Sequence, residues 1–140
     1  MFSKNHFSAL SEFRSELARF LRFSDAVARE NGATSAQYLL LLHLRGFPDR
    51  EWATVGELAI RLQASHQGTV ALVQRCERKG WVRKLRHPED GRSVQIFLTA
   101  SARRLVDRIA KRHRDELDRL AGVLRAARAG RVARSKSGHA

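Results

Sequence analysis

The sequence predicts a mainly α-helical fold with one small β-hairpin. Apolar residues recur at helical spacing along most of the 140-residue chain. Between two such stretches, residues 81–85 alternate apolar with basic side chains, and residues 94–98 form an apolar, β-branched run, which is typical of two short strands. The turn-rich residues 87–92 join them. A helix followed by a hairpin with a basic tip is the winged form of the helix-turn-helix, so we expect an α+β domain of that form, flanked by long helices.

The chain is strongly basic, with a formal net charge of +13 and a pI near 11.5. Such a charge indicates a polyanionic partner, and its coincidence with the winged helix favours double-stranded DNA over a membrane surface or RNA. RNA-binding modules also need aromatic platforms for base stacking, which this sequence lacks. The single cysteine excludes an internal disulfide, and no segment is apolar enough for a signal peptide or a membrane span. We therefore expect a cytoplasmic protein with no membrane partner.

Residues 3–30 are predicted to form a long helix that ends at Asn31-Gly32. So many large apolar residues on a terminal helix exceed what a small domain needs for its own core, and we therefore assign residues 1–32 to a dimerisation helix. The alternative is packing within one subunit. The largely apolar stripe at helical spacing consists of Phe7, Leu10, Phe13, Leu17, Phe20, Leu21, Ser24 and Val27.

A buried central helix is predicted to open the DNA-binding core, residues 33–99. Thr34 and Gln37 have the capping-box pattern, in which a hydroxyl and an amide side chain satisfy free backbone N–H groups at the start of a helix. Residues 38–44 are apolar nearly all round, so this helix is expected to lie inside the domain. We interpret Tyr38 and His43 on it as structural, and the alternative for each is contact with a ligand.

The helix-turn-helix itself is predicted to start at a second capping-box pattern, Thr54 and Glu57, with a short strand at residues 53–55. After a turn, Ser65 is the expected N-cap of the recognition helix, residues 65–79, and Gly80 follows its end. The buried face of the recognition helix is expected to hold Thr69, Leu72, Val73 and Cys76.

The opposite face of the recognition helix carries the predicted DNA contacts. His66 and Gln67, in its first turn, are the best candidates for contact with bases or phosphates. Glutamine can pair with adenine, and neutral histidine can donate or accept at a base edge. Val70 and Ala71 offer only apolar contacts, for example with a thymine methyl group, so we expect helix-end contacts and DNA shape to carry much of the readout. For each single side chain the alternative is a solvated position. The candidates for phosphate contact are Ser65, Arg75, Arg78, Arg83, Lys84 and Arg86.

Several short motifs follow one another through this segment. They are Glu57-Leu58-Ala59, Lys79-Gly80-Trp81-Val82, Asp90-Gly91-Arg92-Ser93-Val94 and Leu98-Thr99. In this order and spacing the segment resembles the MarR family of winged-helix transcription regulators, over roughly residues 34 to 120. The resemblance implies a homodimer that binds a pseudo-palindromic operator and commonly represses transcription.

The same resemblance implies roles in the wing, residues 86–93. Arg92 is expected to reach the DNA backbone or the minor groove, and Asp90 to hold the Arg92 guanidinium in place. The alternative is an ion pair at the tip of the hairpin with no role in DNA binding. In some members of the family, an effector pocket lies between the first helix, the next helix and the scaffold on the wing side. On the basis of this resemblance, we expect that a small-molecule effector relieves repression.

Thr99 is expected to cap a long C-terminal helix over residues 100–124, which links the wing to the dimer interface. Members of the resembled family continue into a further helix, but no second apolar period is visible here. Residues 125–140 are basic and free of acids, which predicts a disordered tail. Such a tail either adds non-specific DNA affinity or serves only as a solubilising end.

No feature of the sequence predicts an enzyme. The histidines and the cysteine show no metal-binding spacing, no nucleophile lies in an activation motif, and no glycine-rich phosphate loop is present, so we expect no catalytic, metal or cofactor site. Cys76 could be a redox sensor, but its position on the buried face favours an inert thiol. The prediction is a homodimeric DNA-binding repressor that uses residues 65–79 and 86–93. The alternative is a basic accessory protein that coats DNA without an effector response.

Overall fold

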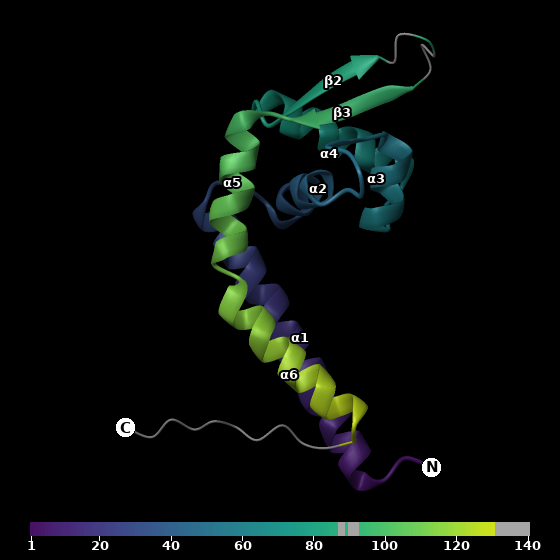
Figure 1. Ribbon diagram of the computed structural model, residues 1–140, viewed down its shortest axis with the longest axis vertical. Coiled ribbons are helices and arrows are strands. Elements are labelled where there is room, and N and C mark those ends of the chain that lie inside the picture. Colours follow the sequence, from purple (N-terminus) through teal and green to yellow (C-terminus); the bar gives the residue numbers. More distant parts are fainter. Residues whose placement is uncertain (87–88, 90–92, 131–140) are drawn as a thin grey trace. The chain divides into compact units, whose positions relative to one another are not determined.

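The computed structural model describes residues 1–86, 89 and 93–130, and these residues are mainly helical (Figure 1). The chain divides into two compact units. Of the described residues, those within 28–111 form one unit, and residues 1–27 and 112–130 form the other. The described part contains six helices and three short antiparallel strands. The predicted class, mainly α with a small β wing, is therefore confirmed.

The unit of residues 28–111 surrounds one central helix. The elements of this unit are α2 Ser35–Arg45, α3 Val55–Leu62, α4 His66–Arg78, α5 Ala100–Lys111, β1 Trp52–Ala53, β2 Val82–Arg86 and β3 Val94–Leu98. Leu40, Leu41 and Leu44 of the central helix, α2, are completely buried, because α2 packs against α3, α4, α5 and the sheet. The strand order is β1-β3-β2, and every neighbouring pair is antiparallel.

The predicted helix starts are confirmed by hydrogen bonds. Thr34 Oγ1 accepts from the Gln37 backbone N–H at 3.1 Å, and Gln37 Oε1 accepts from the Thr34 N–H at 2.9 Å. The same two-way pattern joins Thr54 and Glu57 at the start of α3, at 3.2 and 3.0 Å. Thr99 Oγ1 accepts from the N–H of Ala102 at the start of α5. The strand expected at residues 53–55 is instead Trp52–Ala53, because Val55 is already the first residue of α3.

Tyr38 and His43 both lie on α2, as predicted, and the pKa of each is shifted in the direction that favours the neutral form. Burial raises the pKa of the Tyr38 hydroxyl. Burial lowers the pKa of His43, and the positive charge of Arg61 lowers it further. Both shifts fit side chains that pack within the domain.

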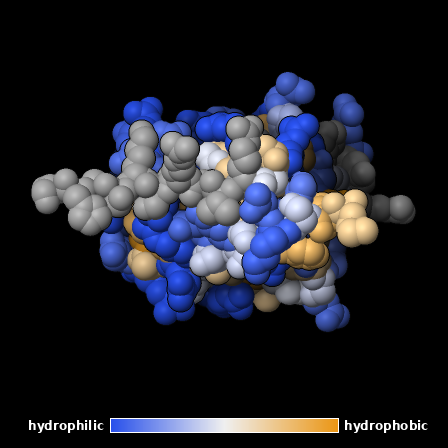
Figure 2. Space-filling view, turned by 90° about the horizontal axis from the view of Figure 1, so that it is seen from below, coloured by the Kyte–Doolittle hydropathy of each residue, from blue (hydrophilic) through white to orange (hydrophobic). Residues whose placement is uncertain are grey.

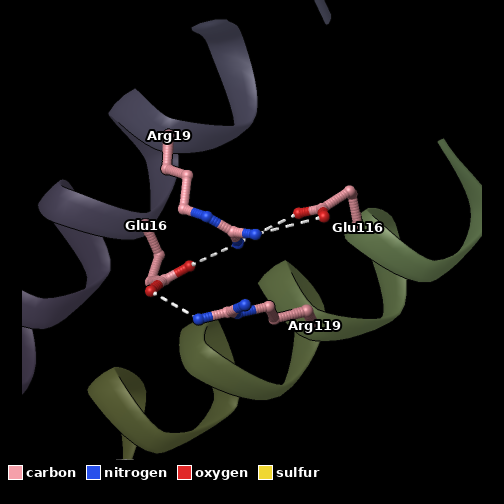
Figure 3. A network of polar contacts seen from close by, with 4 residues as sticks. All are labelled: Glu16, Arg19, Glu116 and Arg119. Carbon is pink, nitrogen blue, oxygen red and sulfur yellow. Dashed lines mark hydrogen bonds and ion pairs between the residues drawn. The ribbon is translucent and has the colours of Figure 1, made fainter. Parts of the chain in front are cut away.

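The other unit is built from the main part of α1 (Lys4–Glu30) and α6 (Arg114–Arg128), which run side by side (Figure 1). A network of four charged side chains joins the two helices (Figure 3). Arg19 donates two hydrogen bonds to the carboxylate of Glu116, at 3.2 and 3.3 Å, and lies 3.5 Å from Glu16. Arg119 donates to Glu16 at 3.1 Å, so each acid has an arginine from the opposite helix.

The single helix expected over residues 100–124 is wrong. The structure has two helices there, α5 and α6, separated by a turn at Arg112 and His113. His113 is buried, and its ring packs edge-on against Phe20 and Phe23 of α1, with centroid distances of 5.7 and 5.5 Å. The sequence did not indicate this turn, because no proline or glycine marks it and the apolar spacing continues through it.

The chain therefore does contain a further C-terminal helix. Residues 125–128, which we expected in the disordered tail, form the last turn of α6. Gly130 follows at a φ of +70°, close against α1, where a Cβ would lie 2.6 Å from the Nε2 atom of His6. The remaining part of the predicted tail, residues 131–140, lies outside the described residues.

Candidate nucleic-acid interface

The recognition helix α4 has the predicted start, end and two faces. Ser65 Oγ accepts from the N–H of Gly68 at 3.0 Å, which caps the helix at its amino end. Its inner face is buried, as predicted, and consists of Thr69, Leu72, Val73 and Cys76. Its outer face is exposed at Ser65, His66, Gln67, Gln74, Arg75 and Arg78 and half-buried at Val70 and Ala71.

Cys76 lies completely inside the domain. Burial raises the pKa of its thiol to about 11, although the neighbouring charge of Arg75 acts in the opposite direction. The reactive form of cysteine is the thiolate, and a thiol with this pKa is almost entirely protonated at neutral pH. The geometry therefore favours a structural cysteine.

The wing strands present a basic surface next to α4. In β2 only the first residue, Val82, is buried, and the other four residues are exposed. Lys84 Nζ lies 3.3 Å from Glu77 Oε1, which links β2 to the last turns of α4. Arg86 is paired with Val94 in the register of the hairpin. Asp90 and Arg92, the predicted Asp–Arg pair of the wing tip, lie outside the described residues.

Positive charge is concentrated on α4 and β2. Residues 65–86 contain six arginine and lysine residues and a single acid, Glu77, which is paired with Lys84. Other acids of the same unit are paired away from α4. Glu57 pairs with Arg50, and Glu51 pairs with both Arg45 and Arg103. This distribution leaves a cationic face that suits a polyanion.

A cavity of about 530 Å³ lies between α4, the wing and the amino end of α3. Val70, Val73 and Ile96 contribute apolar wall, and His66 and Lys84 contribute polar groups. Val70 therefore faces this cavity as well as the solvent. Its half-buried side chain is less available to DNA than the sequence pattern alone suggested.

The amino end of α3, which borders the cavity, is held by a side chain that sequence analysis did not single out. Arg50 pairs with Glu57, and its guanidinium lies 4.5 Å from the ring centroid of Phe47 and 4.0 Å from that of Trp52. Burial alone would raise the pKa of Glu57, but hydrogen bonds from Thr54 and the charge of Arg50 lower it overall. Glu57 is therefore ionised at neutral pH and caps α3 as a carboxylate.

Among residues 1–86, 89 and 93–130, no group of three or more His, Cys, Asp or Glu side chains could hold a metal ion. Within the same residues, no helix has both the length and the apolar character that a membrane span requires.

One family model matches part of the chain. Residues 31–93 match the model of the MarR family. The fold resembles a mutant of Staphylococcus aureus MepR bound to an oligodeoxyribonucleotide, with 22% identity over 79% of this chain and 80% of that chain and a TM-score of 0.67. It also resembles a mutant of Escherichia coli MarR complexed with operator DNA, with 22% identity over 76% and 75% of the two chains and a TM-score of 0.65.

Bordetella bronchiseptica BpsR, whose DNA binding is regulated by 6-hydroxynicotinic acid, has a similar fold. It is 19% identical over 83% of this chain and 81% of its own chain, with a TM-score of 0.65. No curated protein sequence matches the chain.

Proposed function

We propose that the protein is a homodimeric repressor acting in the cytoplasm. The premise of this proposal is that the winged-helix segment of the chain belongs to the MarR family of DNA-binding transcription regulators. Members of this family are regulators rather than enzymes. Each subunit would bind one half of a pseudo-palindromic operator. The observation that carries the proposal is the exposed, cationic face of α4 and β2, whose only acid is neutralised within the unit.

The proposed DNA contacts come from two elements. In α4, the outward-facing side chains, from the first turn onward, would approach base edges and the arginines would bind phosphates, because a recognition helix lies in the major groove with its amino-terminal part against the bases. In the wing, cations would bind the backbone beside the groove. The proposed contact residues are Ser65, His66, Gln67, Val70, Ala71, Arg75, Arg78, Arg86, Asp90 and Arg92.

The proposed dimer uses the unit that contains α1 and α6. Two helices can bury only one face each against the other, and large apolar side chains remain exposed on both helices. Apolar patches (orange) lie at the surface in the view from below (Figure 2). Phe7 is 57% exposed and Leu21 58% exposed on α1, and Leu117 and Leu124 on α6 are each 50% exposed. A second copy would cover these side chains by completing a four-helix bundle.

A small molecule is proposed to relieve repression. The regulation of BpsR by 6-hydroxynicotinic acid supports this part of the proposal. A ligand acts in this way only if it binds the DNA-free state more tightly than the DNA-bound state.

The proposal is tested by fluorescence anisotropy with DNA from upstream of the protein's own gene and with scrambled DNA of equal length, over a series of salt concentrations. A specific repressor should prefer one sequence by about 10³-fold or more. Arg78→Ala should weaken binding to both DNAs and reduce the salt slope by about 1, because it removes one phosphate contact. Arg104→Ala, an exposed arginine on α5, is the matched control.

If the two DNAs bind equally at every salt concentration, the same comparison is made with genomic fragments. Equal binding to all fragments would contradict a specific repressor and would support the alternative, a basic protein that coats DNA. An unchanged salt slope in Arg78→Ala would contradict the proposed phosphate contact of Arg78 at the end of α4.

A further inference from the structure

The most outward positions of α4 form one row. Successive helical residues are rotated by about 100°, so Gln67, Ala71 and Gln74, followed one turn later by Arg78, lie on one line. This line is opposite the buried face of the helix. Gln67 and Gln74 are exposed, and Ala71 between them is half-buried. From residue 67 to residue 74, this outward row thus contains two amide side chains with a single methyl group between them.

The two glutamines are available for a partner. Within the described part of the chain, neither side chain takes part in a hydrogen bond, whereas Gln37 at the start of α2 uses its side chain to cap a helix. Neighbouring positions have other tasks. Val70 lies against the cavity beside the wing, and Arg75 lies to one side of the row and suits a phosphate.

We infer that Gln67, Ala71 and Gln74 make this recognition helix a reader of A·T base pairs. The inference rests on the proposed function and states which operators the helix would select. Glutamine can bond to both N7 and the N6 amino group of adenine, and an alanine methyl group can contact the methyl group of thymine. Between Gln67 and Gln74 the row offers no cation or carboxylate, which are the groups that pair with guanine and cytosine, and Arg78, at the carboxyl end of the helix, is assigned to a phosphate.

The spacing predicts a pattern in each half-site. Seven helical residues correspond to a rise of about 10.5 Å, which is close to three base-pair steps of about 3.4 Å. The small side chain of Ala71 lets the helix approach the bases closely between the two glutamines. Each half-site should therefore contain two selected adenines about three base pairs apart, with a thymine between them.

Selection of bound duplexes from a randomised DNA library, with the full chain at fixed salt, tests the inference. The wild type should enrich the two adenines. Gln67→Glu and Gln74→Glu should each change one of them to cytosine, because a carboxylate accepts from the cytosine N4 amino group and cannot donate to adenine N7. The preference for adenine at that position should fall by about 10-fold, and Gln95→Glu on β3 is the matched control.

Gln67→Ala and Gln74→Ala provide a second test that adds no negative charge. Each should erase the preference at one position and leave the rest of the motif in place. A motif that is unchanged in the glutamine variants, or that lacks the paired adenines, overturns the inference and leaves a specific regulator standing. A wild-type selection without any motif overturns both the inference and the proposed function.

Discussion

Single side chains on α4 show which details a helical pattern can predict. The pattern correctly separated the buried residues Leu72 and Cys76 from the exposed residues Gln67 and Arg78. It could not show that Val70 lies against a cavity, because that cavity is completed by the wing and by the amino end of α3. The role of Arg50 was likewise missed, since its partners Phe47, Trp52 and Glu57 are brought together only by the fold.

Cys76 supports a prediction about thiol chemistry. Its pKa of about 11 lies well above the ordinary value, so the fraction of thiolate at pH 8 is on the order of 0.1%. A thiol reagent such as DTNB should not react with the native protein at pH 8 and should react fully after unfolding. DNA affinity should be the same before and after mild peroxide treatment. Rapid modification of native Cys76 together with loss of DNA binding would instead establish a redox sensor.

Helix starts were predicted from the sequence with success, because their signals are local. Two capping boxes and the Thr99 cap involve residues three positions apart, and the structure contains all of them. The turn at Arg112 and His113 has no local signal. It coincides with the burial of the His113 ring against Phe20 and Phe23, which are about 90 positions away in sequence. Contacts of that range cannot be inferred from apolar spacing alone.

The capping box of α3 should contribute measurably to stability. Thr54→Ala removes the hydroxyl that accepts from the Glu57 N–H, and it should lower the free energy of unfolding by about 1 kcal/mol. Urea denaturation followed by circular dichroism measures this change. Ser101→Ala, at an exposed position in the first turn of α5, should change the free energy of unfolding by less than about 0.5 kcal/mol. Equal effects of the two substitutions would show that the cap is not important for stability.

At the scale of the whole molecule, the two units differ in how completely each buries its large apolar side chains. The unit of residues 28–111 has a continuous core around α2, whereas the unit of α1 and α6 keeps large apolar side chains exposed. The sequence already indicated this excess of apolar residues on the first helix. It did not reveal α6, and so the expected interface lacked a helix that the structure provides.

The exposed side chain of Leu21 provides the test of the dimer. Wild-type protein should have twice the 15.9 kDa mass of one chain in analytical ultracentrifugation. Leu21→Glu should yield monomers, because a charge would have to be buried without a partner in the interface. The monomer should also bind a complete operator less tightly than the wild type, because its two half-sites would then be occupied independently.

Ile60→Glu is the matched control for this substitution. Ile60 is 79% exposed on α3, in the other unit, so a glutamate there changes an exposed apolar side chain without touching α1 or α6. It should leave the mass of the dimer unchanged. A wild-type monomer at micromolar concentration, or a Leu21→Glu variant that remains dimeric, would contradict the proposed interface. Because the two substitutions add the same charge, a difference between them can be assigned to the place of Leu21 on the exposed face of α1.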